Sequence, residues 1–381
     1  RRQRQMCIRD RVCTNKGDHA NPNVRCRLVA RQIRHPGTDS VFAPTPPLEA
    51  LRTVLSFAVT KFEGESKTWA PDSENRMQLS FIDISRAYFN AHVDPSEPTF
   101  VELPPELGAP AGTCGRLCRH MYGTQKAAEG WQEEYSCTLR ELGFEQGRAC
   151  PCLFFHRKRG LVTSVHGDDF TTAGPKHQLD WFEDQMAKAY ELTRGGRLGP
   201  GKGDDKEATV LNRVVRWTSA GLEYEADPRQ VERLLAEVEL AGEKINGSAT
   251  PGSKVTATQV AEEIELPPEM TTPYRGWAAR ANYLAADRPD TLFAAKEVCR
   301  FMSKPTNLAM VALKRLCRYL RTRQRLVFRY DYQSATHLDV YSDTDHAGCI
   351  RTRKSTSGGC LMVGRHTVSY THLRAHETHD D

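Results

Sequence analysis

Leu161 to Gly174 reads L-V-T-S-V-H-G-D-D-F-T-T-A-G, a pattern typical of a β-hairpin with an acidic tip. One apolar run precedes the turn and Phe170 to Ala173 forms a second, and both predict short strands. Gly167-Asp168-Asp169 lies between the runs and predicts the turn itself. Acids in turns are usually only solvated. Two adjacent carboxylates at the end of a rigid ribbon are nevertheless a candidate functional site.

The same tripeptide occurs a second time, as Gly203-Asp204-Asp205. This copy lies within G-P-G-K-G-D-D-K-E, where no strand pattern is visible on either side. We therefore predict that Gly195 to Asp205 is a glycine-rich loop. The flanking apolar runs distinguish the first copy from the second and make Asp168 and Asp169 the stronger candidates.

Composition bounds the class of protein. The 381 residues suffice for about two to three domains with a sizeable core. The chain is 39% hydrophobic and has no apolar run long enough to span a bilayer, so we expect no membrane partner. A net charge of +5 permits a polyanionic partner without demonstrating one. The 12 cysteines lack zinc-ribbon spacing, so we expect reduced thiols in an intracellular chain, with metal binding as the second interpretation.

Both ends of the chain differ from its middle. Gln3 to Arg11 and Ser369 to Thr378 resemble translated sequencing-adaptor sequence. We therefore exclude residues 1–22 from the expected fold as an artefactual or disordered leader, and residues 366–381 as an artefactual tail. His372, His376 and His379 lie in this tail, and their spacing is not interpreted as a zinc site.

Periodicity predicts helices on one face of an antiparallel sheet, with the acids on an open face. The expected strands are Val24 to Ile33, Met77 to Ile82, Cys152 to His156, the acidic hairpin, and a second hairpin of Val210 to Trp217 with Leu222 to Tyr224. The expected helices are Leu48 to Val59, Trp131 to Leu142 and Leu179 to Tyr190.

Two groups of charged residues accompany these strands. Asp83 follows Met77 to Ile82 and can face the acidic hairpin if both strands belong to one sheet; taken alone it is more often a helix cap. Arg25, Arg27 and Arg31 can project from one face of the Val24 to Ile33 strand. The alternative for the arginines is a solvated edge strand.

The C-terminal third is predicted to be helical from about Pro273 to Arg323, after a linker over Gly247 to Pro268. One helix buries a leucine-rich face and presents basic residues on another. These basic residues are Lys314, Arg318, Arg321 and Arg325. They predict either a solvated face or a nucleic-acid contact. His337 to Ser342 then alternates into Asp343, and Gly358 to Val363 predicts a further strand.

Ordered motifs from about Val24 to Gly364 resemble the reverse transcriptase of copia-type retrotransposon polyproteins. The motifs that carry the resemblance are R-L-V-A-R at Arg27 to Arg31, Q-L-S-F-I-D-I-S-R-A-Y-F-N at Gln78 to Asn90, V-E-L-P-P-E at Val101 to Glu106, M-Y-G-T-Q-K-A-A-E-G-W at Met121 to Trp131, H-G-D-D at His166 to Asp169, R-F-M-S-K-P-T at Arg300 to Thr306, and Y-S-D-T-D-H-A-G at Tyr341 to Gly348.

This resemblance implies an α+β fold: a right-hand polymerase with an antiparallel palm sheet, a helical connection and a truncated ribonuclease H-like start. The implied boundaries are fingers at 23–75, palm at 76–225, a thumb-like segment and linker at 226–268, the helical connection at 269–334, and the ribonuclease H start at 335–365.

The resemblance also implies the chemistry of an RNA-directed DNA polymerase. Asp83 and Asp168 would bridge two Mg²⁺ ions, with Mn²⁺ as a substitute, and Asp169 would complete or support the site. The Ile84 carbonyl would add a ligand, and Tyr88 would select deoxynucleotides, although core packing explains Tyr88 equally well from sequence alone. Arg25, Arg27 or Arg31 would hold the triphosphate. The implied partners are an RNA template, a DNA primer and deoxynucleoside triphosphates.

Departures from the family pattern keep alternatives open. His166-Gly167 replaces a tyrosine-valine pair, and Lys126 stands where a nucleotide-contacting glutamine is expected. Asp343 matches the first metal-binding acid of ribonuclease H, but matches to the other acids are missing, so we expect no RNA cleavage. The second hypothesis is a catalytically inactive remnant that binds nucleic acid. A third, other nucleotide chemistry on the same palm, fits the downstream motifs less well.

Overall fold

The computed structural model describes residues 6–15, 21–32, 46–110, 112–227, 229–239 and 246–374. The chain divides into two compact units, each of which is considered by itself. The first unit combines the N-terminal region up to Val54 with Leu79–Arg197, and the second combines Leu55–Gln78 with the chain from Leu198 onward. Helix α1, Leu48–Val59, has the bounds predicted from its apolar spacing.

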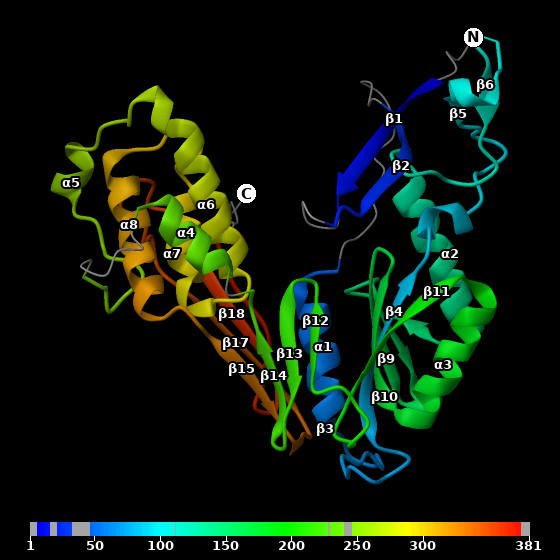
Figure 1. The fold of residues 1–381 in the computed structure, drawn as a ribbon. Helices are drawn as coiled ribbons and strands as arrows, with labels where there is room; N and C mark the ends of the chain where they lie inside the picture. Colours follow the sequence, from blue (N-terminus) through cyan, green and yellow to red (C-terminus); the bar gives the residue numbers. More distant parts are fainter. Residues whose placement is uncertain are drawn as a thin grey trace, which may run out of the picture. The chain divides into compact units, whose positions relative to one another are not determined.

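A six-stranded sheet forms the centre of the first unit, in the order β11-β4-β10-β9-β8-β7. Its strands are β4 (Met77–Ile84), β7 (Glu145–Gln146), β8 (Leu153–His156), β9 (Leu161–His166), β10 (Asp169–Pro175) and β11 (Leu192–Leu198). Helices α2 (Ala127–Glu141) and α3 (Lys176–Ala189) both lie on one face of this sheet (Figure 1). The predicted strands around Asp83, Cys152 and the acidic hairpin are confirmed.

Apolar side chains from the sheet and both helices form one core. Ile82 and Ile84 of β4 pack with Trp131, Tyr135 and further apolar side chains of α2, α3, β9 and β10. Alternate residues of a strand point to opposite faces, so Asp83 lies on the face away from this core.

A buried carboxylate fastens α3 to the sheet. Glu183 of α3 accepts hydrogen bonds from Ser80 of β4 at 2.6 Å and from Arg197 of β11 at 2.6 Å. Removing either donor would leave a buried charge less well satisfied. The contact therefore fixes both strands against α3.

The prediction of a loop from Gly195 to Asp205 is wrong for its first part. Leu192–Leu198 is a strand that pairs with β4. A Cβ atom at Gly195 would lie 3.1 Å from the Cβ of Phe81, so glycine allows close approach of the two strands. Only Gly199 to Lys206 remains outside a strand, and β12 follows it.

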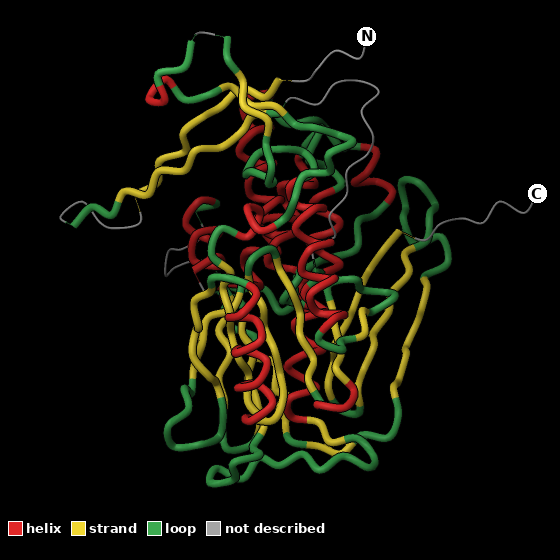
Figure 2. Tube along the Cα trace, turned by 90° about the vertical axis from the view of Figure 1, so that its right-hand side faces the viewer, coloured by secondary structure: helices red, strands yellow, loops and turns green. Residues whose placement is uncertain are grey.

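A four-stranded sheet also belongs to the first unit, in the order β2-β1-β5-β6. Its strands are β1 (Met6–Asn15), β2 (Val24–Arg31), β5 (Phe100–Glu102) and β6 (Cys114–Arg116). Strands β1 and β2 form an extended antiparallel ribbon (Figure 1 and Figure 2). This sheet draws on residues 100–116, which the predicted fingers segment of residues 23–75 does not include.

The structure differs from two predictions: that both chain ends lie outside the fold, and that the cysteines are reduced. Met6–Asn15 pairs with β2, and His366–Arg374 forms β19, which pairs with β18 (Thr356–Val363). Residues 1–5, 16–20 and 375–381, including His376 and His379, lie outside the described residues. Cys13 and Cys26 are direct ladder partners in β1 and β2 and form a disulfide with Cα atoms 4.1 Å apart.

Helices dominate the core of the second unit. Helices α4 (Arg229–Glu237), α6 (Thr271–Ala285), α7 (Pro289–Cys299) and α8 (Asn307–Thr322) contribute to one apolar cluster. The predicted helical region from about Pro273 to Arg323 is thus confirmed. Because α4 shares this cluster, the expected boundary between the segment 226–268 and the connection 269–334 does not separate two cores. The short helix α5 spans Ala257–Ala261.

The strands of the second unit, as far as the structure describes it, form three sheets. One has the order β12-β13-β14-β15, from Glu207–Val210, Arg213–Trp217, Gly221–Glu225 and Val327–Asp331. A second pairs β3 (Thr60–Lys61) with β16 (Gln333–Ser334), and the third joins β17 (Leu338–Thr344), β18 and β19. The strands of residues 207–225 therefore share a sheet with β15 and not with the six-stranded sheet, although the expected palm extends to residue 225.

The predicted strand Val210 to Trp217 is interrupted by a turn. Leu211 and Asn212 have φ values of 49° and 63°, and Val210 pairs with Arg213 around them. Two positive φ values in a two-residue connection are typical of a type I′ turn. The prediction was wrong because leucine rarely adopts this conformation.

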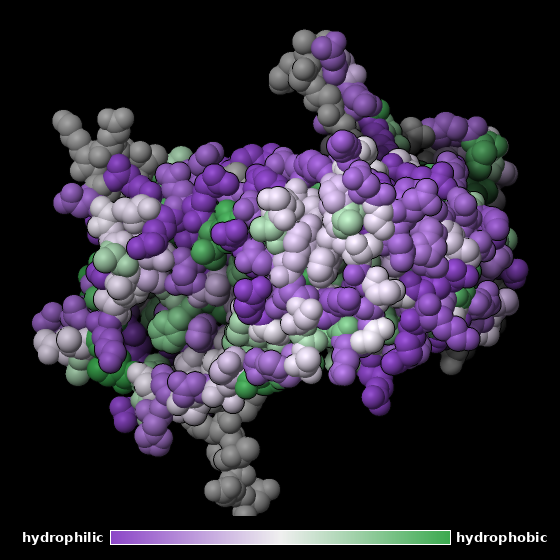
Figure 3. Space-filling model, turned by 90° about the horizontal axis from the view of Figure 1, so that it is seen from below, coloured by the Kyte–Doolittle hydropathy of each residue, from purple (hydrophilic) through white to green (hydrophobic). Residues whose placement is uncertain are grey.

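Short 3₁₀ helices complete the described elements, at η1 (Ala87–Asn90), η2 (Pro105–Leu107), η3 (Arg157–Arg159) and η4 (Pro268–Met270). In the described parts of the chain, no helix combines the length and apolarity needed to cross a bilayer. Hydrophilic residues predominate on the molecular face in Figure 3, where apolar side chains appear in scattered groups.

Candidate active site

The acidic hairpin has the tight turn that its sequence predicts. Asp169 pairs with His166 in the β9–β10 ladder, which leaves Gly167 and Asp168 as the two turn residues. Gly167 has a φ of 66°, and glycine in this first turn position is typical of a type II′ turn. The buried Trp131 of α2 donates its indole N–H to the Gly167 carbonyl at 2.7 Å. A core helix thus holds the tip of the hairpin in place.

The carboxyl end of β4 lies against this tip. The backbone N–H of Ile84 donates to the Asp168 carbonyl at 2.9 Å. The end of β4 thus meets the start of β10, so these neighbouring strands run antiparallel. This register sets Asp83 opposite Asp169, where cross-strand Cβ atoms are about 4.5–5.5 Å apart. The structure brings together the three acids that the sequence singled out.

The electrostatics of the cluster show uncompensated negative charge. Partial burial, together with the negative charges of Asp168 and Asp83, raises the pKa of Asp169 to about 6. Across the described ranges, none of these three carboxylates forms an ion pair or accepts a side-chain hydrogen bond. Like charges at this distance favour protonation of one acid or binding of a cation.

The acids fit magnesium by chemistry. Mg²⁺ prefers carboxylate oxygens and needs only a few of them, because it retains several waters. Burial is the largest cause of the raised pKa of Asp169, and repulsion from Asp168 and Asp83, which a divalent cation would relieve, adds to it. As the side chains lie, no group of three or more histidine, cysteine, aspartate or glutamate residues in the described part of the chain is arranged to hold a metal. Side-chain rotation would be needed for the three carboxylates to converge.

Tyr88 approaches the acids because the chain turns sharply after β4. Arg86 adopts a left-handed conformation, with φ 55° and ψ 41°, immediately before η1. Burial and the negative charge of Asp168 raise the pKa of the Tyr88 hydroxyl. Tyr88 therefore lies near Asp168, and its ring is half-buried.

Tyr122 is a site residue that the sequence analysis did not single out. Its ring centroid is 4.7 Å from that of Tyr88 and 5.7 Å from that of Phe89. Burial and Asp168 raise the pKa of Tyr122, and Arg27 opposes that rise. The available signal was the M-Y-G-T sequence, in which glycine after an aromatic predicts a tight turn.

The structure distinguishes among the three arginines of β2. The guanidinium carbon of Arg27 lies 5.4 Å from the centroid of the Tyr122 ring. Arg25 is also close enough to lower the pKa of Tyr122. Arg27 is therefore the arginine that most directly accompanies the acid–tyrosine cluster, and Arg25 lies next to it on the same strand face.

Lys126 and Asp343 each have a local partner in the structure. Lys126 immediately precedes α2 and forms an ion pair with Glu97. Asp343 lies in β17 opposite Gly358 and accepts a hydrogen bond from the Thr344 N–H at 2.8 Å. Asp343 belongs to the second unit, and its role in a ribonuclease H site stays a prediction.

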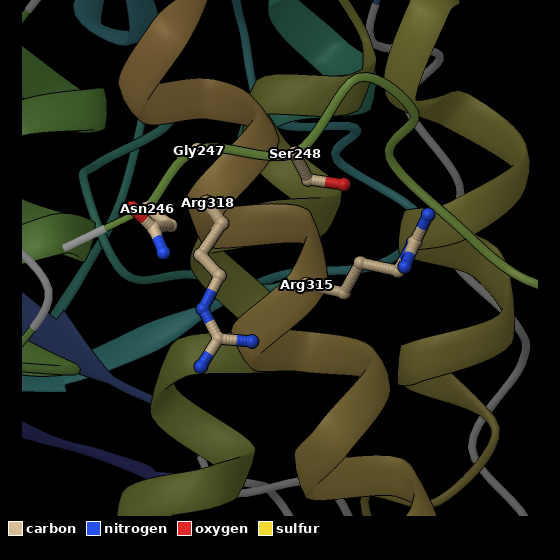
Figure 4. A pocket seen from close by; sticks show the side chains of 5 residues that line it. All are labelled: Asn246, Gly247, Ser248, Arg315 and Arg318. Carbon is tan, nitrogen blue, oxygen red and sulfur yellow. The ribbon is translucent and has the colours of Figure 1, made fainter.

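The basic face of α8 is partly used within the fold. Arg325, just beyond the helix, donates from Nη2 to Glu225 at 2.8 Å. Arg315 and Arg318 line a pocket of about 460 Å³ with Asn246, Gly247 and Ser248 (Figure 4). In Figure 4 the two arginine side chains leave α8 in different directions. The cations do not converge on one point, so the pocket is not built as a single anion site.

The second Gly-Asp-Asp tripeptide has an internal partner. Asp204 accepts hydrogen bonds from Arg76 at 2.7 and 2.8 Å, from the Gln78 amide at 2.7 Å and from the Gly201 N–H at 2.8 Å. Although burial opposes ionisation, these donors hold the pKa of Asp204 far below its usual value. Asp204 is therefore a structural acid.

Residues 3–200 match the family described as reverse transcriptase (RNA-dependent DNA polymerase), which is more than half of the chain and includes all three clustered acids. The chain belongs to the reverse transcriptase family. The match also begins within the N-terminal segment that the sequence analysis excluded.

Relatives of this reverse transcriptase chain are polyproteins of copia-type retrotransposons. It is 23% identical over 371 residues to the retrovirus-related Pol polyprotein from transposon TNT 1-94 of Nicotiana tabacum, covering 93% of this chain and 26% of that protein. It is 25% identical over 360 residues to the corresponding polyprotein from transposon RE2 of Arabidopsis thaliana, covering 91% and 22%. The chain thus spans about a quarter of the length of these relatives and corresponds to their reverse transcriptase region.

Proposed function

We propose that this chain is an RNA-directed DNA polymerase domain that extends a DNA primer on an RNA template by two-metal nucleotidyl transfer. The observation that carries the proposal is the hydrogen bond from Ile84 to Asp168, because it sets Asp83 beside the hairpin acids. The elevated pKa of Asp169 supports it, since a cluster of uncompensated carboxylates is suited to binding cations. The family match supports the same class of reaction.

Each residue of the cluster has a distinct task in this proposal. The primer 3′ hydroxyl attacks the α-phosphorus of a deoxynucleoside triphosphate, a new phosphodiester bond forms and pyrophosphate leaves. Asp83 and Asp168 would hold Mg²⁺, and Asp169 would support them. When bound, the metal stabilises charge on the entering and leaving oxygens. Arg27 would contact the triphosphate, and the Tyr88 ring would pack against the deoxyribose.

Primer extension tests the proposal. The full chain is incubated with oligo(dT) annealed to poly(rA), dTTP and Mg²⁺, and product length is measured with time. Extension is expected, and Asp168→Asn should reduce its rate by about 100-fold or more. Asp205→Asn is the control, because it removes a carboxylate from the other Gly-Asp-Asp tripeptide without changing the structural acid Asp204, and it should leave extension unchanged.

The same samples distinguish the alternative hypothesis. A catalytically inactive remnant would bind the primer–template in a salt-sensitive manner without extending it, and binding would be unaffected by Asp168→Asn. Binding without extension over a range of Mg²⁺ and Mn²⁺ concentrations would therefore overturn the polymerase proposal and favour the remnant. Extension by the Asp168→Asn variant at the wild-type rate would overturn the assigned role of the acids.

A further inference from the structure

Tyr122 lies in a turn that leaves its backbone little freedom. The Met121 carbonyl accepts a hydrogen bond from the Thr124 N–H at 3.1 Å, which closes a four-residue turn around Tyr122 and Gly123. Gly123 has a φ of 86°, as the third position of a type II turn requires. Tyr122 therefore occupies the second position of a turn with well-defined geometry.

The turn is also fastened to β2. The Ala30 N–H donates to the Tyr122 carbonyl at 2.7 Å, and the Gln32 N–H donates to the Gly123 carbonyl at 3.4 Å. A Cβ atom at Gly123 would lie 1.8 Å from the Ala30 carbonyl oxygen, so no other residue fits without moving the strand. The backbone of Tyr122 is thus held against β2, which limits where its ring can lie.

The Tyr122 ring contacts groups that surround the acids. It packs on Tyr88 at 4.7 Å between ring centroids, with an interplanar angle of 59°. The guanidinium carbon of Arg27 is 5.4 Å from its centroid. Such ring and cation contacts each contribute modestly and depend on geometry. Tyr122 is therefore placed to fix how the Tyr88 ring lies relative to Asp168.

We propose that Tyr122 is a positioning residue for sugar selection, which supports the Tyr88 ring so that it excludes a ribose 2′ hydroxyl. The inference rests on the proposed polymerase function and adds a residue to it. A ring that can tilt leaves room for the additional hydroxyl, whereas a ring supported from the side does not. Loss of Tyr122 should therefore change the choice between nucleotides more than the rate of extension with the preferred one.

The test compares dTTP with UTP on the same primer–template. Tyr122→Leu should reduce the preference for dTTP by about tenfold, because a branched aliphatic side chain cannot reproduce the ring contact. Tyr122→Phe should retain the preference, since it keeps the ring and loses only the hydroxyl. An equal decrease in dTTP and UTP use by Tyr122→Leu would indicate a merely structural role and overturn the inference.

A double-variant cycle shows whether Tyr122 acts through Tyr88. Tyr88→Val should abolish most of the preference, and adding Tyr122→Leu should then have no further effect on it. A further loss of preference in the double variant would show that Tyr122 acts independently of Tyr88, which would overturn the positioning role. Arg27→Met should weaken the preference slightly, because it removes the cation whose guanidinium carbon lies 5.4 Å from the Tyr122 ring centroid.

A binding measurement distinguishes failure of the polymerase proposal from failure of the inference about Tyr122. Dissociation constants for dTTP and UTP are measured on the full chain with a dideoxy-terminated primer–template, so that no extension is required. If the wild type does not extend primers but binds dTTP more tightly than UTP, the same variants test Tyr122 by this ratio. Equal binding of both nucleotides by the wild type, or binding of neither, would overturn the inference.

Discussion

Gly167-Asp168-Asp169 and Gly203-Asp204-Asp205 are identical in sequence but differ in what surrounds their acids. In the first, Asp169 has a pKa raised to about 6, next to Asp168 and Asp83. In the second, Asp204 has a strongly lowered pKa and is held by Arg76, Gln78 and the Gly201 N–H. An acid that accepts hydrogen bonds from neighbouring donors stabilises the fold. An acid among other acids carries uncompensated charge and is suited to binding a cation.

The largest expected effect is that the same substitution reduces activity in one tripeptide and stability in the other. Asp168→Asn should reduce primer extension by about 100-fold or more and leave stability nearly unchanged. Asp204→Asn should lower the free energy of unfolding by about 3 kcal/mol, because Arg76 and Asp204 have side chains only 14% and 5% exposed. Primer extension and urea denaturation of both variants check this.

The dependence of stability on pH further tests the structural role of Asp204. A carboxylate with a lowered folded-state pKa stabilises the fold above its ordinary pKa, and this contribution is lost as the pH falls below about 4. The wild type should therefore lose stability in this range more steeply than Asp204→Asn. Parallel pH profiles of the two proteins would contradict the structural role of Asp204.

The second expected effect concerns the pH dependence of activity. With a pKa of about 6, Asp169 is mostly ionised at pH 7 and mostly protonated at pH 5. Protonation competes with metal binding, so Mg²⁺-dependent extension should fall by about tenfold between pH 7 and pH 5. Raising the Mg²⁺ concentration at pH 5 should restore part of the activity. A loss that added Mg²⁺ does not reverse would indicate another titrating group.

The third expected effect concerns the hairpin tip. Trp131→Phe removes the indole N–H that donates to the Gly167 carbonyl but keeps an aromatic ring in the core. Loss of one such hydrogen bond should reduce extension by about fivefold, because the tip carrying Asp168 is less firmly held. Single-turnover extension measures the effect. Trp181→Phe on α3 is the control, since the Trp181 ring packs against His156 and Arg159.

The smallest expected effect compares the third residues of the two tripeptides. Asp169→Asn removes repulsion from Asp168 and Asp83, so it should raise the melting temperature at pH 7 by about 1–3 °C. The gain should vanish at pH 4, where Asp169 is already protonated. Asp205→Asn should change stability by less than about 0.5 kcal/mol at either pH. Equal melting shifts in both variants would remove the distinction.

Local sequence signals predicted what depends on local geometry. The acidic hairpin follows from two apolar runs around a Gly-Asp turn, and α1 follows from its apolar spacing. The position of Asp83 next to Asp169 depends on pairing between strands more than 80 residues apart, for which only the family resemblance gave an indication.

The predictions that were wrong or missing concern features that depend on non-local packing. Leu192–Leu198 was missed because two adjacent glycines disfavour a strand; Gly195 allows the approach to Phe81 in β4, and Gly196 has a positive φ of 91°. Tyr122 was missed because its role depends on contacts with Tyr88 and Arg27 that no periodicity reveals. The assignment of β5 and β6 to the β1–β2 sheet likewise follows from tertiary pairing alone.

The bond from Ile84 to Asp168 joins two peptide groups and involves no side chain. Substitutions at neighbouring positions can therefore accumulate without disturbing the alignment of the acids, provided that the turn can still form. This accounts for how His166-Gly167 can stand in place of a tyrosine-valine pair. The alignment of the acids depends on a main-chain hydrogen bond. Substitutions around the hairpin therefore disturb it only when they change the path of the backbone.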